Sequence, residues 1–233
     1  MEKTIKVILW DIDGTLLNFQ MAETYAIRKC FEIFELGVCT DEMLARYSVI
    51  NRGFWERLER GELTREQVLR GRFAEFFASE GICFDKVDDF NAEYQIRLGD
   101  KVFFNDNAYE LVKDLKKHVK QYAVTNGTRI AQDRKLKLSG LEELLDGVFI
   151  SEVLGVDKPN PAFFEKVWET IGTYEADTVA IIGDSLTSDM QGGNYAGIQC
   201  WWYNPFGKKS EAQLRIDREL HDLQELRAIF GIA

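Results

Sequence analysis

The sequence predicts an α/β protein, in which a parallel sheet is covered by helices on both faces and a bundle of helices is inserted after the first strand. Three observations lead to this prediction. From residue 102 onward, short apolar runs alternate with helical patterns, which is typical of parallel sheets. The first apolar run, residues 5–10, is nearly free of charge, as expected of a strand buried on both faces. Residues 17–101, in contrast, contain helical patterns alone.

The apolar run at residues 5–10 ends at two carboxylates, Asp11 and Asp13, which are followed by Gly14 and Thr15. Ligands of parallel sheets bind beyond the carboxyl ends of the strands, so these carboxylates stand where chemistry is expected. Gly14 allows the chain to turn there, which lets the two carboxylates take different roles around one site. Taken alone, an Asp-x-Asp-Gly segment can equally be a simple strand end, and the choice depends on partners further along the chain.

Residues 17–101 contain a series of amphipathic helical patterns. Apolar residues recur at helical spacing in residues 22–34, 41–58, 68–77 and 87–98. Each pattern is followed by a glycine that can end a helix, namely Gly37, Gly61, Gly81 and Gly99. Thr64 and Gln67 form a capping-box pair ahead of the third pattern. We therefore expect a small helical bundle, and because it interrupts the chain just after the first strand, it should cover that strand's carboxyl end.

The rest of the chain alternates between strand and helix. Strand patterns occur at residues 121–125, 147–150, 178–182 and 199–203. Helical patterns occur at residues 108–118, 161–171 and 223–230, with a further helix expected after the second strand. The predicted domains are therefore an α/β core made of residues 1–16 and 102–233, and a helical cap made of residues 17–101.

Composition narrows the class of protein. A net charge of -10 over 233 residues disfavours nucleic acid as a partner, because binding to a phosphate backbone uses clustered Lys and Arg. It is compatible with a small-molecule phosphomonoester bound at one cationic site. The four cysteines are widely spaced and form no CxxC pair, so we expect a reduced, cytoplasmic protein without disulfides or zinc. No apolar run reaches the ~18 residues of a membrane span, and we expect no signal peptide or membrane partner.

Each later strand is followed by polar side chains of the kind that the first carboxylates would need. Thr125 and Asn126 precede a glycine in a turn whose hydroxyl, amide and free N–H groups suit phosphate oxygens. Lys158 stands before a proline that stiffens its loop. Asp184 and Asp189 follow the fourth strand. Taken singly, each has an ordinary structural role: a turn, a solvated lysine or a helix cap.

Together these side chains indicate a metal-dependent site. The carboxyl ends of parallel strands meet at one edge of the sheet, so the acids after the first and fourth strands should lie close together. Like-charge repulsion would strain such a cluster unless a cation were bound. Mg²⁺ prefers carboxylate oxygens, water and substrate oxygens as ligands. The sequence therefore predicts Mg²⁺ as cofactor, with one acid left free for proton transfer.

These segments resemble the motifs of the haloacid dehalogenase (HAD) superfamily of phosphohydrolases. The matching motifs are Asp11-x-Asp13-Gly14-Thr15, Thr125-Asn126-Gly127, Lys158-Pro159, and Gly183-Asp184 with Asp189. The resemblance runs through the whole chain and implies a Rossmann-like core. The helical insertion after the first motif resembles the C1-type cap of this superfamily.

The resemblance implies a role for each motif residue. Asp11 would be the nucleophile that forms an aspartyl-phosphate, and Asp13 the general acid/base. Thr125 and Lys158 would bind the phosphate and neutralise charge. The chemistry is reasonable because phosphoryl transfer needs mainly positioning and charge neutralisation, so a held carboxylate can serve as nucleophile.

The resemblance also implies the metal ligands. Asp11, the backbone carbonyl of Asp13 and Asp184 would hold Mg²⁺, with Asp189 nearby. The dehalogenases proper lack the second acid and need no metal. Asp13 and Asp184 therefore argue against cleavage of a carbon–halogen bond.

The cap sequence indicates the substrate. Residues 49–65 and 71–73 resemble the house-cleaning pyrimidine 5′-nucleotidases of the superfamily, and residues 150–160 agree. We therefore expect a nucleoside pocket lined by Phe19, Asn51, Trp55 and Arg72, in which aromatic rings stack on a base. Packing within the cap is the alternative role for Trp55 and Arg72.

The function expected from the sequence is a Mg²⁺-dependent 5′-nucleotidase acting on nucleoside monophosphates. A phosphatase for small sugar or glycolate phosphates is the alternative, because the core motifs determine the reaction and not the leaving group. A catalytically silent binding protein would have no need of Asp11, Asp13, Lys158 and Asp184 together. A phosphomutase would use the same acids but retain the phosphate.

Overall fold

The protein, described here by a computed structural model over residues 4–210 and 213–232, has a parallel sheet at its centre. Within these residues, six strands pair in the order β3-β2-β1-β4-β5-β6, and every neighbouring pair is parallel. The strands are β1 (Val7–Trp10), β2 (Lys120–Thr125), β3 (Gly147–Ile150), β4 (Val179–Gly183), β5 (Gln199–Tyr203) and β6 (Arg218–Leu220). The predicted α/β class and parallel sheet are confirmed, with β1 at the middle of the sheet.

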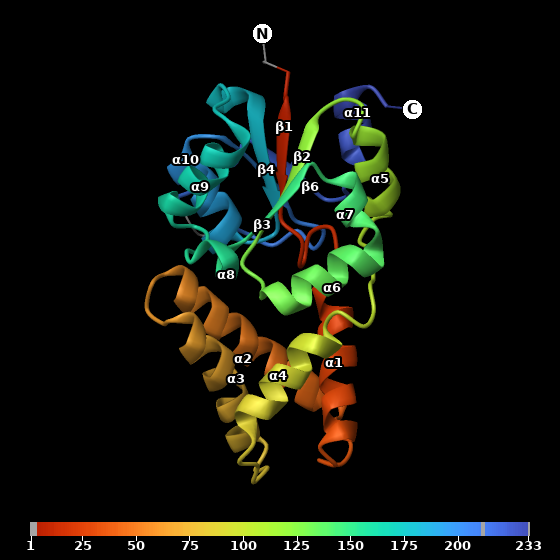
Figure 1. Ribbon diagram of the computed structural model, residues 1–233, viewed down its shortest axis with the longest axis vertical. Coiled ribbons are helices and arrows are strands. Elements are labelled where there is room, and N and C mark those ends of the chain that lie inside the picture. Colours follow the sequence, from red (N-terminus) through yellow and green to blue (C-terminus); the bar gives the residue numbers. More distant parts are fainter. Residues whose placement is uncertain (1–3, 211–212, 233) are drawn as a thin grey trace.

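Helices cover both faces of the sheet (Figure 1). The helices of the core are α5 (Ala108–Leu115), α6 (Arg129–Ser139), α7 (Leu141–Leu144), α8 (Ser151–Leu154), α9 (Pro161–Ile171), α10 (Gln191–Ala196) and α11 (Glu225–Phe230). Side chains of β1 alternate between two hydrophobic clusters, because successive strand residues point to opposite faces. Ile8 and Trp10 belong to the cluster that includes α5, whereas Val7 and Leu9 belong to the cluster that includes α9. Burial on both faces explains the uninterrupted apolar run.

The strand β6 is absent from the sequence prediction. It has three residues, Arg218, Glu219 and Leu220, of which Leu220 alone is buried. It lies at the edge of the sheet and pairs with β5. So short and polar a segment carries no strand pattern, and its pairing depends on the tertiary structure.

The helical insertion forms a bundle beyond the carboxyl ends of the strands (Figure 1). Its helices are α1 (Phe19–Ile33), α2 (Asp41–Glu59), α3 (Arg65–Ser79) and α4 (Val87–Arg97). The predicted capping box is present at the start of α3, where Thr64 and Gln67 bond each other's backbone N–H groups. The bundle encloses a hydrophobic core of its own, rich in aromatic side chains: Phe31, Tyr47, Phe73, Phe76, Phe77, Phe90 and Tyr94. Among the described residues, no helix is long and apolar enough to cross a membrane.

Two linkers join the bundle to the sheet, and they run side by side. Asn18 N–H donates to the carbonyl of Phe103 (2.8 Å), and Asn105 N–H donates to the carbonyl of Leu16 (3.1 Å). Leu17 and Phe104 form an antiparallel bridge between these bonds. Because the bundle leaves the core and returns to it at this one point, we propose the domain division expected from the sequence: a core of residues 1–16 and 102–233 and a cap of residues 17–101.

Candidate active site

Asp11 directly follows β1 and is held from two sides. Thr15 Oγ1 donates to Asp11 Oδ2 (3.1 Å), and Lys158 Nζ donates to Asp11 Oδ1 (3.0 Å). The turn that follows requires glycine, because Gly14 has a φ of +101° and a Cβ there would lie 2.7 Å from the Asp184 carboxylate. The glycine after Asp13 thus lets the first and fourth strand ends approach closely.

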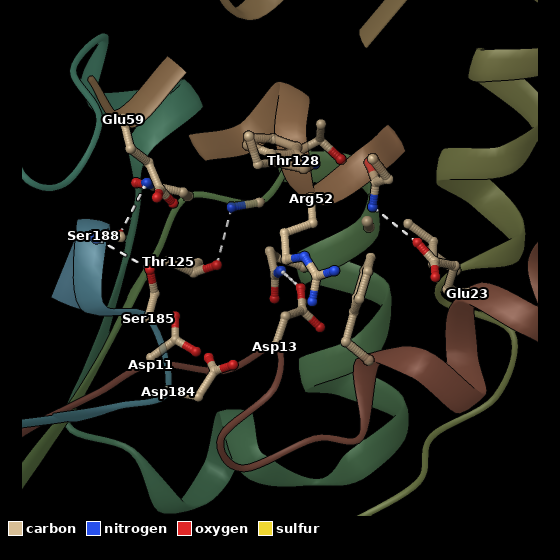
Figure 2. Close-up of a pocket in the computed structure, with 18 of the residues that line it drawn as sticks. Asp11, Asp13, Glu23, Arg52, Glu59, Thr125, Thr128, Asp184, Ser185 and Ser188 are labelled. Carbon is tan, nitrogen blue, oxygen red and sulfur yellow. Dashed lines mark hydrogen bonds between the residues drawn. The ribbon is translucent and has the colours of Figure 1, made fainter. Parts of the chain in front are cut away.

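The carboxylates of Asp11, Asp184 and Asp189 form one cluster. Each offers an oxygen within 4.8 Å of the others. Asp184 follows β4 and faces Asp11 (Figure 2), while Asp189 lies in a π-helical turn, Leu186–Met190, just beyond it. Asp189 is held in place by Lys158 Nζ, which donates to Oδ1 (2.6 Å), and by the backbone N–H of Ser185, which donates to Oδ2 (3.2 Å).

Burial and mutual repulsion shape the electrostatics of this cluster. Burial raises the pKa of Asp11 well above its usual value, and the Asp189 and Asp184 carboxylates add to that effect against the attraction of Lys158. Burial, with the neighbouring Asp189, also raises the pKa of Asp184 to about 7. Burial alone would lower the pKa of Lys158, but Asp11 and Asp189 outweigh it and hold that pKa above its usual value. Burial and neighbouring negative charge therefore disfavour the ionised forms of Asp11 and Asp184.

A divalent metal fits this arrangement. The donors are oxygen atoms from carboxylates spaced closely enough to share one ion, and hard cations such as Mg²⁺ take this kind of ligand. The acids repel one another less when a cation lies between them. A cation at this position would favour the ionised forms of Asp11 and Asp184, whose pKa values are raised.

The loop after β2 is tied to the loop that carries Lys158. Asn126 Nδ2 donates to the Lys158 carbonyl (2.8 Å), and the Lys158 N–H donates to Asn126 Oδ1 (2.8 Å). Thr125, which is buried, accepts a hydrogen bond from the Gly127 N–H (3.0 Å). The Asn126 amide is thus engaged in positioning Lys158, and the phosphate-binding roles of Thr125 and Asn126 stay predictions.

Asp13 has two partners that the sequence did not reveal. Gln132 Nε2 donates to Asp13 Oδ2 (2.6 Å), and Lys135 Nζ donates to Asp13 Oδ1 (2.6 Å). Both side chains come from α6, and both are buried. A Cβ at Gly127 would lie 2.2 Å from Gln132 Nε2, so this glycine leaves the path to Asp13 open. The sequence signal that could have identified Gln132 and Lys135 is their position on the same face of α6 as its buried apolar residues.

A cavity of about 310 Å³ separates the cap from these acids. Its wall includes the core residues Asp11, Asp13, Thr125, Asn126, Asp184 and Asp189, and the predicted cap residues Phe19, Asn51, Trp55 and Arg72. Lys158 contacts two of these wall residues. The structure thus brings the predicted residues together around one space, and their roles stay predictions. It adds wall residues absent from the prediction, among them Ser48 and Gln95. Figure 2 shows four more of them: Glu23, Arg52, Glu59 and Thr128.

The cap residues of the wall are engaged in different ways. The Phe19 ring lies under Lys135 Nζ, 5.3 Å from the ring centroid, and the Arg72 guanidinium lies 5.9 Å from the Trp55 ring. Arg72 is buried, and its Nη1 donates to Asn51 Oδ1 (2.9 Å). Asn51 and Arg72 therefore bond each other within the cavity wall, and the contact with substrate expected of both stays a prediction.

Two side chains of the cap reach the core beside the acid cluster. Glu59, at the end of α2, accepts a hydrogen bond from Thr187 Oγ1. Arg65, at the start of α3, donates to the Asn126 carbonyl (3.0 Å) and pairs with Asp157. Loss of hydration raises the pKa of Glu59 to about 8. These contacts hold the cap over the cavity.

The fold and site together define a hydrolase with an acidic active centre under a helical cap. The sequence model of the haloacid dehalogenase-like hydrolases matches residues 5–197, and the chain belongs to this family. The resemblance expected from the motifs is thereby confirmed.

Known relatives are similar to this chain in sequence over nearly its whole length. The HAD-hydrolase YfnB of Bacillus subtilis is 35% identical over 230 residues, which cover 99% of this chain and 97% of YfnB. The pyrimidine 5′-nucleotidase PynA of Streptococcus pneumoniae is 34% identical over 224 residues, which cover 95% of this chain and 93% of PynA. The crystal structure of YfnB bound to magnesium, which reveals interdomain movement, matches with a TM-score of 0.92 and 34% identity over 99% of this chain and 100% of that one.

Glu59 gives a testable pH dependence of stability. Its pKa is about 8 in the folded protein, so the folded state keeps a proton that the unfolded state releases near pH 4.5. The contribution of Glu59 to the free energy of unfolding therefore falls as pH rises through this window. In EDTA, Glu59→Gln should gain stability relative to the unsubstituted protein by on the order of 1–2 kcal/mol between pH 6 and pH 8.5, measured by thermal unfolding. Glu56→Gln, one turn earlier in α2 with a side chain that is 44% exposed, is the control, and parallel curves for all three proteins would contradict the prediction.

Proposed function

We propose that the protein is a Mg²⁺-dependent phosphatase that hydrolyses nucleoside 5′-monophosphates through an aspartyl-phosphate on Asp11. The observation that carries this proposal is the position of Asp11, which is held by Lys158 and lies beside a second acid, Asp13, in a cavity closed by the cap. A fixed nucleophile and a separate proton donor are the groups that phosphoryl transfer to a carboxylate requires.

The reaction follows from these residues in two steps. An Asp11 carboxylate oxygen attacks phosphorus, the bond from phosphorus to the ester oxygen breaks, and Asp13 gives its proton to the departing alkoxide. Water then attacks the aspartyl-phosphate, its proton passes to Asp13, and inorganic phosphate leaves with Asp11 regenerated. Lys158 neutralises charge on Asp11 throughout, and Gln132 and Lys135 hold the Asp13 carboxylate in position.

Mg²⁺ would be held by the carboxylates of Asp11 and Asp184, the backbone carbonyl of Asp13 and, nearby, Asp189. When bound, it would supply positive charge to the phosphate oxygens and orient them toward the nucleophile. Thr125, which is buried beside Asp11 in the same cavity wall, would bind a phosphate oxygen.

The size and lining of the cavity support a nucleoside as leaving group. Its volume of about 310 Å³ is at the lower end of small-molecule sites. The rings of Phe19 and Trp55 offer stacking surfaces, and PynA, with which 34% of aligned residues are identical, is a pyrimidine 5′-nucleotidase. A cytoplasmic location stays a prediction; the described cysteines, Cys30, Cys39, Cys83 and Cys200, are free thiols, as in a reducing compartment.

Phosphate release from a substrate panel tests the proposal. The panel contains uridine, thymidine, cytidine and adenosine 5′-monophosphates, ribose 5-phosphate, phosphoglycolate and an aryl phosphate, each with Mg²⁺ and with EDTA. We expect the highest kcat/KM for a nucleotide and no turnover in EDTA. Preference for ribose 5-phosphate or phosphoglycolate would favour the sugar or glycolate phosphatase, and full activity after exhaustive chelation would contradict the metal assignment.

The nucleophile assignment predicts the behaviour of Asp11→Asn. The amide is nearly the same shape as the carboxylate, so the fold should persist while multiple turnover is lost. The measurement is phosphate release from the aryl phosphate, together with thermal unfolding to verify folding. Sustained turnover by a folded, sequence-verified Asp11→Asn protein would refute the assignment.

The two hydrogen bonds that hold the Asp13 carboxylate predict the behaviour of Lys135→Met. The substitution removes one of two donors that fix the Asp13 carboxylate, and misplacement of a catalytic group costs up to about a hundredfold in rate. We expect kcat for the aryl phosphate to fall by about tenfold to a hundredfold, with little change in KM. Lys137→Met, at an exposed position of the same helix, is the matched control. Equal kcat for the two variants would show that Lys135 does not position Asp13.

A further inference from the structure

A chain of buried hydrogen bonds crosses the cap and begins at Glu23 of α1. Asn51 Nδ2, from α2, donates to Glu23 Oε1 (2.8 Å). Arg72 Nη1, from α3, donates to Asn51 Oδ1 (2.9 Å). Glu23, Asn51 and Arg72 are each at most 3% exposed, yet all three belong to the cavity wall.

The chain continues through α4 to the core. Arg72 Nη2 donates to Asn91 Oδ1 (3.0 Å), and Gln95 Nε2 donates to the same oxygen (3.2 Å). Gln95 Oε1 accepts a hydrogen bond from Thr128 Oγ1 (2.7 Å), and Thr128 is the residue that precedes α6. The network therefore joins every helix of the cap to the core helix that carries Gln132 and Lys135.

The network fixes the orientation of its members. A guanidinium can only donate, so Asn51 must direct its oxygen to Arg72 and its NH₂ group to Glu23. Glu23 is thereby held as an acceptor at the end of the chain. Burial raises the pKa of Glu23 to about 7, against hydrogen bonds from Ser48 and Asn51 and the charge of Arg72, so the ionised carboxylate prevails above pH 7.

Glu23 lies across the cavity from the acid cluster. Figure 2 shows its carboxylate on the side of the cavity opposite Asp11 and Asp184. A phosphomonoester bound at Asp11 would therefore direct its leaving group toward Glu23. An ionised carboxylate has about four acceptor positions, and the bonds from Asn51 and Ser48 leave capacity for a donor from the ligand.

We propose that Glu23 selects the leaving group by accepting a hydrogen bond from the N3–H of a uracil-type base. This inference rests on the proposed nucleotidase function. A uracil or thymine edge presents a carbonyl, an N–H and a second carbonyl. Glu23 supplies the acceptor for the N–H, and the second N–H of the Asn51 amide is a donor suited to one of the carbonyls.

The same edge of cytosine has a hydrogen-bond acceptor at its centre, where uracil has a donor. Its N3 carries a lone pair, which would face the Glu23 carboxylate with no proton between them. Sites built to hydrogen-bond a substrate group discriminate strongly against analogues that leave a buried polar group unpaired. Arg72 acts through Asn51 on Glu23, so it is a positioning residue in this scheme.

The test compares kcat/KM for four substrates with Mg²⁺: uridine 5′-monophosphate, its N3-methyl derivative, cytidine 5′-monophosphate and an aryl phosphate. The unsubstituted protein should prefer the uridine nucleotide over each of the other nucleotides by about tenfold to a hundredfold. Cytidine has almost the same shape as uridine. A lower kcat/KM for the cytidine nucleotide would therefore reflect a difference in hydrogen bonding rather than in steric fit. This measurement needs no variant.

Glu23→Gln then tests the residue. The glutamine NH₂ group can donate to cytosine N3, so the uridine-to-cytidine ratio of kcat/KM should fall by at least about tenfold. Glu32→Gln, exposed at the end of the same helix, should keep the original ratio.

Two results would overturn the proposal while leaving a nucleotidase: equal kcat/KM for uridine and cytidine nucleotides in the unsubstituted protein, or an unchanged ratio in Glu23→Gln. Hydrolysis of ribose 5-phosphate or phosphoglycolate without hydrolysis of any nucleotide would instead overturn the proposed function and the role of Glu23 with it.

Discussion

The burial of several carboxylates beside one lysine is the constraint on which the rest of this structure depends. Asp11, Asp184 and Asp189 come within 4.8 Å of one another around Lys158, where water cannot screen their repulsion. Such an approach is possible because the neighbouring residues are small: a Cβ at Gly183 would lie 2.2 Å from the Asp189 carboxylate, and Gly14 makes the corresponding room for Asp184. A site that concentrates negative charge in this way is unfavourable by itself and favourable once cations enter it. The geometry of the site therefore suits the binding of a cation better than it suits the stability of the metal-free fold.

The interior of the cap combines an aromatic core with one buried chain of polar side chains. Most of its interior is aromatic, but one polar chain runs through it from Glu23 to Thr128. Buried polar networks gain little stability over an apolar core, yet their hydrogen bonds restrict side-chain orientation. The core thus carries the acid cluster, and the cap supplies a polar wall of the cavity. Arg65 and Glu59 join these two parts beside the loop that follows β2 and beside the acid cluster.

The sequence predicted the features that depend on local pattern. Apolar runs identified the strands buried on both faces, and the capping box identified the start of α3. Each of these signals is contained in a few consecutive residues. The acids of the site were predictable since parallel strands share an edge. The edge strand β6 was not, because a segment with one buried residue has no pattern of its own. Gln132, Lys135 and Glu23 escaped notice for a related reason: a polar residue on a helix becomes a site residue only through what the tertiary fold places opposite it.

The paired linkers carry an evolutionary consequence. Leu16 to Asn18 and Phe103 to Asn105 lie against each other, so the inserted segment departs from and returns to the sheet at nearly one place. The hydrogen-bonding register of the strands is then independent of the length and identity of whatever stands between the linkers. A lineage can enlarge, exchange or rebuild that segment while inheriting an unchanged reaction centre. New leaving-group preferences can arise by recombination of whole modules, without any step at which the ancestral chemistry is lost.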